Sequence, residues 1–313
     1  MIWKRKDLLG LEELDKAEIN LILETAASFK EISTRTVKKV PTLRGKTIVL
    51  FFFEPSTRTR SSFELAAKRL SADTLSIATS TSAMQKGETL KDTLKNIEAM
   101  QVDAIILRHS ASGVAQTLAK CIKPSIINAG DGCHEHPTQA LLDIFTIKEK
   151  KQKIAGLNVS IIGDITHSRV ARSNIWGLKK LGALVTVCGP RTLIPRGIEE
   201  MGVKITTNLE TALKDADVVN VLRIQKERQE AGLFPSLREY AMRFGVSKEK
   251  LMRFAKKDVL IMHPGPMNRG IEIMPDVADG EFSVILDQVT NGIAIRMAVL
   301  FLVTQGKSEE QQE

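Results

Sequence analysis

The sequence predicts an α/β protein of two doubly wound domains, each with a mainly parallel sheet flanked by helices, joined by helical linkers. At 313 residues the chain is longer than one hydrophobic core usually supports. Short apolar runs rich in branched residues recur along it, and a helical pattern follows each run, as in buried parallel strands connected by helices. The runs fall into two series, one in each half of the chain.

The first series indicates a domain over residues 1–150. Apolar residues at helical spacing predict an opening helix at 14–32, which Asp15 is suited to cap. A helical pattern from Pro137 ends in the charged stretch 148–153, and we place the domain boundary there. The strands between these helices are predicted at residues 47–53, 74–78, 104–107 and 125–128.

The second series indicates a domain over residues 151–286. A last helix, at about 287–305, is expected to pack back on the first domain. In open parallel sheets, ligands bind beyond the carboxyl ends of the strands, so functional residues are expected in the segments that follow them. The strands are predicted at residues 159–162, 184–188, 203–205, 218–222 and 259–262.

The charge of the chain suits a small anionic substrate. A formal charge of +8 is compatible with nucleic acid, an anionic membrane or an anionic ligand in a positive cleft. The basic residues lie in mixed-sign stretches, and no basic block alternates with aromatic residues, as a surface for stacking single strands requires. Nucleic acid is therefore not an expected partner.

Cysteine usage and hydropathy favour a cytoplasmic protein. The three cysteines form no CxxC pair, which suits a reducing compartment. The first eleven residues lack the apolar centre of a signal peptide. The longest apolar run, 293–303, contains Arg296 and is shorter than the ~20 residues that a membrane span needs, so no membrane segment is expected.

The segment after the first predicted strand has the composition of a phosphate site. It reads EPSTRTRSS at 54–62 and leads into a helical pattern. The backbone N–H groups and the dipole at a helix N-terminus favour an anion, and Arg58 or Arg60 can add a forked grip on phosphate. A capped helix with solvated arginines is the alternative, but one hydroxyl would suffice for a cap, whereas this segment has five hydroxyls and two arginines.

Two nucleotide-binding patterns fail when tested against the sequence. Gly45-Lys46-Thr47 resembles the end of a P-loop, but Val40 stands where the first glycine is needed. The turn at 163–168 lacks the second and third glycines of a dinucleotide-binding fingerprint. Neither a P-loop nucleotide site nor a nicotinamide site is predicted, and no cofactor is expected.

A polar stretch, GDGCHEHPTQ at 130–139, follows another predicted strand. Its two histidines, cysteine and carboxylates raise the possibility of a metal site, but no further His or Cys pair with ligand spacing lies nearby, so no metal is expected. His136, at the start of the next helix, can instead donate to a carbonyl oxygen. A surface polar loop is the alternative.

These motifs closely resemble the catalytic chains of the aspartate carbamoyltransferase family. The resemblance covers nearly the whole chain outside its tail. It is carried by FEPSTRTR at 53–60, KGET at 86–89, Arg108-His109, NAGDG at 128–132, HPTQ at 136–139, Gly163-Asp164 with Arg169, RIQKER at 223–228 and HPGP at 263–266.

The resemblance implies an enzyme of pyrimidine biosynthesis that transfers the carbamoyl group of carbamoyl phosphate to the amino group of L-aspartate. It implies catalytic roles for Arg58, Thr59, Arg108 and His136. It implies that carbamoyl phosphate is bound by Ser56, Thr57, Arg58, Thr59, Ser82, Lys86, Arg108, His136 and Gln139, and aspartate by Lys86, Arg169, Arg223, Gln225 and the backbone carbonyls of Pro264 and Gly265.

In this family Ser82 and Lys86 reach the neighbouring subunit's site, so a homotrimer with shared sites is implied. Regulatory chains or dihydroorotase are possible further partners. Cys133, His134 and His167 lie beside matched positions without being matched, and we interpret them as structural or solvent-facing.

The sequence leaves two alternative functions to consider. Ornithine carbamoyltransferase shares the phosphate loop and the HPTQ segment, but its family has His-Cys-Leu-Pro where this chain has HPGP at 263–266. Arg169 and Arg223 suit a dicarboxylate better than ornithine. An inactive carbamoyltransferase-like scaffold is the second alternative, which the presence of every checked site residue disfavours.

Overall fold

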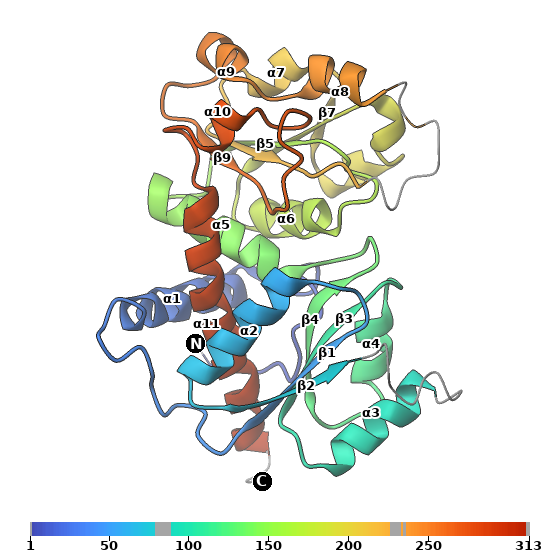
Figure 1. Cartoon of the computed structure of the whole chain (residues 1–313), viewed down its shortest axis with the longest axis vertical. Helices are drawn as coiled ribbons and strands as arrows, with labels where there is room; N and C mark the ends of the chain where they lie inside the picture. The colour runs from blue at the N-terminus through green and yellow to red at the C-terminus, as the bar shows by residue number, and fades with distance from the viewer. Residues whose placement is uncertain (1, 79–88, 226–232, 234–235, 311–313) are drawn as a thin grey trace. The chain divides into compact units, whose positions relative to one another are not determined.

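A computed structural model describes residues 2–78, 89–225, 233 and 236–310 of the chain (Figure 1). The chain divides into two compact units. Unit 1 comprises Met1–Leu141 with Thr290–Glu313, and unit 2 comprises Leu142–Val289. The divisions fall within two helices, α5 (Pro137–Lys151) and α11 (Ile285–Glu310).

Unit 1 contains a four-stranded parallel sheet, which confirms the predicted fold class for this half of the chain. Every strand pairing is parallel, and the order is β2-β1-β3-β4. The chain therefore reverses its direction of winding between β1 and β3, which is where open parallel sheets bind ligands. The strands are β1 (Thr47–Phe52), β2 (Asp73–Ala78), β3 (Ala104–His109) and β4 (Ser125–Asp131).

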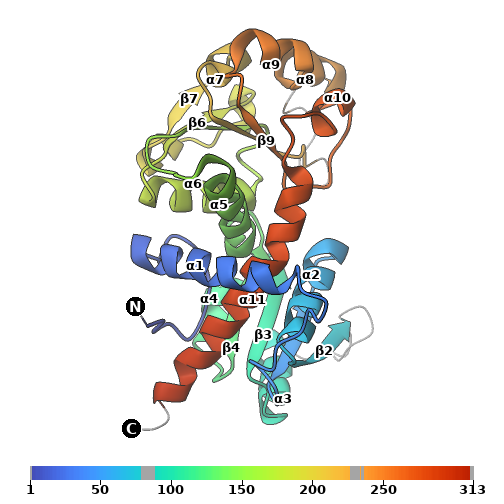
Figure 2. The same cartoon turned by 90° about the vertical axis from the view of Figure 1, so that its left-hand side faces the viewer.

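Helices cover both faces of this sheet (Figures 1 and 2). The apolar side chains of α3 and α4 form one core with alternate residues of the strands, such as Val49, Phe51 and Ile105. The opposite face is covered by α1, α2 and α11. The helices are α1 (Lys16–Ile32), α2 (Thr57–Arg69), α3 (Leu90–Ala99) and α4 (Val114–Ala119).

The N-terminal segment pairs with the edge of the unit 1 sheet, beside β4, which the sequence did not indicate. Leu8 forms a parallel bridge with Ile127 beside β4, and Asp15 begins α1 with a capping box that includes Glu18. The segment is thus fixed to the strand whose carboxyl end leads to His136.

Unit 2 contains a five-stranded parallel sheet of order β7-β6-β5-β8-β9, so its winding reverses between β5 and β8. The strands are β5 (Asn158–Ile162), β6 (Leu184–Cys188), β7 (Lys204–Thr206), β8 (Val218–Val221) and β9 (Leu260–Met262). The helical segments are α6 (Arg169–Lys180), η3 (Arg191–Leu193), η4 (Ile198–Met201), α7 (Leu209–Leu213), α8 (Leu237–Phe244), α9 (Lys248–Phe254) and α10 (Pro275–Ala278).

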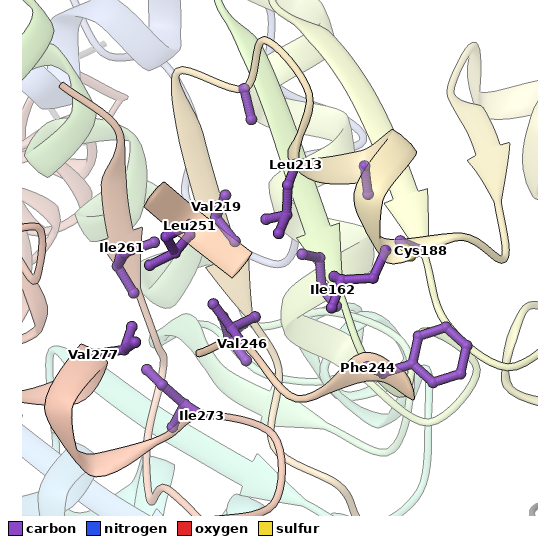
Figure 3. Packing of buried hydrophobic residues seen from close by; sticks show 14 of the residues in the cluster. Ile162, Cys188, Leu213, Val219, Phe244, Val246, Leu251, Ile261, Ile273 and Val277 are labelled. Carbon is purple, nitrogen blue, oxygen red and sulfur yellow. The ribbon is translucent and has the colours of Figure 1, made fainter. Parts of the chain in front are cut away.

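One face of this second sheet carries the large apolar core shown in Figure 3. Val219 and Val221 of β8 and Ile261 of β9 meet apolar residues of α7, α8, α9 and α10, including Leu213 and Phe244. Because side chains alternate across a strand, Asn220 of β8 points to the other face, where α5 and α6 lie.

The C-terminal helix α11 packs within the structure along most of its length. Residues Ile285–Gln305 are long and apolar enough to cross a membrane by composition alone, but 67% of the most apolar window is buried, as in the core helix of a folded domain. Within unit 1, Phe301 meets Phe29 edge to face and Arg296 donates to the Ser62 hydroxyl. The apolar stretch is longer than the run 293–303 that the sequence alone singled out.

Candidate active site

The turn between β1 and α2 is a helix start whose N-cap hydroxyl makes no cap hydrogen bond. Ser56 occupies the N-cap position with extended backbone but makes no side-chain cap bond, in contrast to the described caps Asp15, Thr89 and Ser168, which accept from their first turns. The hydroxyl of Ser56 and the N–H groups of the first turn are therefore not committed to each other, as an anion site requires.

The residues that follow Ser56 differ in their exposure to solvent. Thr57 and Arg58 are exposed, whereas Thr59 is 8% exposed and points into unit 1. The arginine can therefore reach a ligand in solvent while Thr59 offers a hydroxyl from the protein side. A ligand phosphate at this turn would meet the positive end of the α2 dipole.

Arg108 lies at the end of β3, the strand adjacent to β1. Its guanidinium donates to the carbonyl of Ala129 at 3.1 Å and to Oε1 of Glu54 at 2.8 Å. Glu54 belongs to the turn before α2, so this ion pair joins the carboxyl ends of β1 and β3. The pair is mostly shielded, since the exposed fractions of the two side chains are 11% and 22%. Sequence reasoning found Arg108 but not its carboxylate partner.

The loop between β4 and α5 places His136, which is 4% exposed, directly before the helix. Asp131 holds this loop. It accepts from Asn128 Nδ2 at 2.8 Å and from the backbone N–H of Gly113 at 2.7 Å, and it pairs with Nδ1 of His134 at 3.1 Å. Gln139 follows in the first turn of α5 and is partly exposed.

The environment of the loop shifts two pKa values. Burial by itself raises the pKa of Asp131, but hydrogen bonds from His134, Asn128 and Gly113 lower it on balance. The hydrogen bond to Asp131 raises the pKa of His134, and burial offsets part of that rise. His134 thus supports the loop through its bond to Asp131.

A second carboxylate, Glu135, connects the loop to the N-terminal segment. It is 1% exposed, and its two oxygens accept from the backbone N–H groups of Leu11 at 2.8 Å and Glu12 at 3.1 Å. Possible ligand atoms of Glu12, His134 and Glu135 lie within 4.8 Å of one another. Since Glu135 and His134 already bond to groups of the fold, this cluster is explained without an ion.

In unit 2, the segments after β5 and β8 carry the two arginines. Arg169 is the first residue of α6 and is 5% exposed, beside Ser168, whose hydroxyl accepts from the N–H of Ala171 at 3.2 Å. Arg223 and Gln225 follow β8, and both are partly exposed. The two segments thus start from the adjacent strands at which the winding of the sheet reverses.

Gly163 explains how these segments approach each other. Its φ is +136°, and a Cβ atom there would lie 3.0 Å from Leu222 Cβ and from the Leu222 carbonyl oxygen. A larger residue would therefore separate the ends of β5 and β8. His167, which lies in the same turn, pairs with Asp164 at 2.8 Å, as expected for a structural histidine.

The loop after β9 contains the segment 263–266. Nδ1 of His263 accepts from the backbone N–H of Gly265 at 2.8 Å, so the proton of a neutral ring lies on Nε2, 3.3 Å from Oε1 of the buried Glu272. Gly265 has a φ of +63°, which glycine adopts without strain. Pro264 and Gly265 are both partly exposed.

The structure thus brings the predicted residues into two groups, one in each unit. Unit 1 holds residues 56–59, Arg108, His136 and Gln139, and unit 2 holds Arg169, Arg223, Gln225, Pro264 and Gly265. Ser82 and Lys86 lie outside the described residues.

Comparison with known proteins follows the same division. The family described as "Aspartate/ornithine carbamoyltransferase, carbamoyl-P binding domain" matches residues 6–149, and "Aspartate/ornithine carbamoyltransferase, Asp/Orn binding domain" matches residues 155–303. The aspartate carbamoyltransferase catalytic subunit of Halothermothrix orenii is 64% identical over 97% of this chain and 96% of its own length. That of Syntrophobacter fumaroxidans is 62% identical over 97% of this chain and 100% of its own.

Solved structures of the family share the fold. Aspartate transcarbamoylase from Trypanosoma cruzi, in complex with N-(phosphonacetyl)-L-aspartic acid, is similar with a TM-score of 0.87 at 29% identity, covering 96% of each chain. Ornithine carbamoyltransferase from Pyrococcus furiosus is similar with a TM-score of 0.85 at 35% identity, covering 96% of this chain and 97% of its own. With both domains matched and about 60% identity over nearly its full length, this chain belongs to the aspartate carbamoyltransferase family, as a catalytic subunit.

Proposed function

We propose that this enzyme, which transfers the carbamoyl group of carbamoyl phosphate to L-aspartate, divides its two substrates between the two units. Carbamoyl phosphate is assigned to residues 1–150 and aspartate to residues 151–286. The observation that supports this division is that residues 56–59 and Arg108 lie at the ends of β1 and β3, and Arg169 and Arg223 lie after β5 and β8. These are the strand pairs at which the winding of each sheet reverses.

In unit 1, the proposal assigns the phosphate group to the start of α2. Ser56, Thr57 and Thr59 offer hydroxyls there, and Arg58 offers a charged fork. Lys86, and Ser82 with it, are assigned to the same substrate. The assignment is supported by the N-cap residue Ser56, whose hydroxyl makes no cap hydrogen bond.

The carbamoyl oxygen is assigned to donors from three strand ends. Thr59, Arg108 and His136 surround the place where negative charge grows as the amine attacks, and each such donor typically contributes ~10²- to 10³-fold. Gln139 is assigned to the carbamoyl amino group. The burial of Arg108 and His136 supports this role, because a donor held in place inside the protein loses little energy in reorganising.

In unit 2, the proposal assigns the two carboxylates of aspartate to Arg169, Arg223 and Gln225. Lys86 is assigned to aspartate as well. The carbonyl groups of Pro264 and Gly265 accept from the attacking amine. Both substrates are anions, and the proposal assigns arginines to each of them. The positive net charge of the chain suits such substrates.

Ornithine is a second candidate acceptor, because the chain matches a family that includes both activities and is similar to an ornithine carbamoyltransferase structure. The arginines at 169 and 223 favour a dicarboxylate over the cationic side chain of ornithine. Phosphate release from carbamoyl phosphate, measured with each amino acid, separates the two: we expect release with L-aspartate only. Release with L-ornithine would remove the assignment of Arg169 and Arg223. Silence of the folded chain with both acceptors would favour an inactive scaffold.

We also propose that the active assembly is a cytoplasmic homotrimer in which Ser82 and Lys86 act in the neighbouring subunit's site. Further assembly with regulatory chains or dihydroorotase is compatible with this arrangement. The proposal follows the family resemblance of the KGET segment at 86–89. Mixing two inactive variants and measuring the recovery of activity tests it.

A further inference from the structure

A buried carboxylate lies behind the proposed aspartate site. Asp143 is on the unit 2 part of α5 and is 0% exposed. It lies on the face of the second sheet opposite the apolar core, which is the face to which Asn220 of β8 points. A carboxylate without access to water requires donors from the protein around it.

Side-chain amides from three other elements supply such donors. Asn174 of α6 donates to Oδ2 of Asp143 at 2.8 Å, and Asn220 donates to the same oxygen at 3.3 Å. Gln288 of α11 donates to Oδ1 at 2.7 Å. The three amide side chains are themselves 0%, 2% and 3% exposed, in that order. Asp143 therefore connects α5, α6, β8 and α11 inside unit 2.

The connection continues to the loop after β9. While Gln288 donates to Asp143, its own Oε1 accepts from the backbone N–H of His263 at 3.0 Å. The ring of His263 in turn accepts from the N–H of Gly265. Asp143 is thus two hydrogen bonds away from the segment 263–266.

Each of the three amides that bond to Asp143 is linked to a segment with residues of the proposed aspartate site. Asn174 is on α6, which begins with Arg169; Asn220 is on β8, which leads to Arg223; and Gln288 binds the start of the loop with Pro264 and Gly265. We propose that Asp143 is a positioning residue for the amino-acid substrate: it fixes the relative places of these three segments without touching the substrate. The proposal rests on the assignment of those residues to aspartate made above.

A carboxylate suits this position because it only accepts, and all three neighbours donate. An asparagine at this position would keep the size of the side chain, but its amide group would place a donor against one of the donors already present. The expected result is a local shift of the segments rather than loss of the core, which lies on the other face of the sheet.

Steady-state kinetics of Asp143→Asn test the proposal. We expect the KM for L-aspartate to rise by about tenfold, on the scale of one misplaced hydrogen bond, while the KM for carbamoyl phosphate stays within about twofold. The matched control is Asp287→Asn, since Asp287 is a more exposed carboxylate of α11 that pairs with Lys150. The control should leave both constants unchanged.

A reciprocal exchange separates positioning from general damage. In the double variant Asp143→Asn with Gln288→Glu, the new amide can donate to the new carboxylate, whose other oxygen still accepts from the N–H of His263. The carbonyl oxygen of the new amide can still accept from Asn174 and Asn220. The double variant should regain most of the aspartate affinity that Asp143→Asn loses, whereas Gln288→Glu alone, with two carboxylates adjacent, should not.

Several outcomes would overturn the role of Asp143. These are an unchanged KM for aspartate in Asp143→Asn, an equal rise in both KM values, or no recovery in the exchange variant. If Asp143→Asn does not fold, Gln288→Met removes the bond to Asp143 and the bond to the N–H of His263 together, while the bonds from Asn174 and Asn220 to Asp143 stay. This variant should raise the aspartate KM, and an unchanged KM would refute the role. If Arg223→Ala also leaves the aspartate KM unchanged, the proposed substrate site fails; if Arg223→Ala raises it and Asp143→Asn does not, only the positioning role fails.

Discussion

The side chains of Asp131 and His134 show how single residues support the loop between β4 and α5. The pair lies between the end of β4 and His136, and the bond between them lowers the pKa of the carboxyl and raises the pKa of the imidazole. A group whose pKa is raised by folding stabilises the folded state fully below its unfolded value and loses that effect as pH rises through its folded value.

The stability that His134 contributes should therefore depend on pH. We expect the free energy of unfolding of the wild type to exceed that of His134→Gln by more at about pH 5.5 than at about pH 8.5. The reason is that the unfolded histidine titrates near 6.5, while Asp131 is ionised throughout this range. Urea unfolding at fixed protein concentration gives the comparison. Cys133→Ser, beside the pair, is the control. An equal difference at both pH values would mean that the pair is not charged as described.

The residues that we propose to contact a ligand could be named from the sequence, but their partners within the fold could not. The segment 56–59 and His136 follow predicted strands, so the pattern indicated them, whereas Arg108 was named only through the family resemblance. The partners depend on contacts between distant parts of the chain. Glu54 pairs with Arg108, Glu135 supports the N-terminal segment, and Asp143 is the centre of an amide cluster. No periodicity in the sequence encodes such pairings.

At the scale of elements, the predicted strands correspond to the observed strands because buried parallel strands form continuous apolar runs. The largest difference is at the end of β4, which extends to Asp131 rather than to residue 128. The polar end of this strand, NAGD, has no continuous apolar run. It is buried with its polar groups paired, since Asn128 donates both to Asp131 and to the carbonyl of Leu9 in the N-terminal segment. Tertiary hydrogen bonds thus lengthened a strand whose composition predicted a loop.

The short helices of unit 2 were less predictable for a similar reason. α7 has five residues and α10 has four. Elements of this length are not stable by local preference, since helix nucleation alone is unfavourable over so few residues. They form because their apolar residues, such as Leu213 and Val277, complete the core on one face of the sheet.

At the scale of the whole molecule, the proposed trimer makes a prediction about mixed chains. Arg58→Ala and Lys86→Ala should each be inactive alone, because each removes a group from every shared site. After mixing and subunit exchange, some hybrid trimers contain a site with both groups intact, so part of the activity should return. Recovery is measured as phosphate release before and after exchange. If exchange is demonstrated and no activity returns, the sites are not shared.

The central claim is that carbamoyl phosphate and aspartate are held by different units, and steady-state kinetics of two arginine variants test it most directly. Arg223→Ala should raise the KM for L-aspartate by about tenfold or more while the affinity for carbamoyl phosphate, measured by calorimetry, is unchanged. Arg58→Ala should abolish measurable carbamoyl phosphate binding in a folded chain, and Arg44→Ala, an exposed arginine of unit 1, should affect neither. Equal loss of both substrates in Arg223→Ala, or normal carbamoyl phosphate binding in Arg58→Ala, would contradict the account.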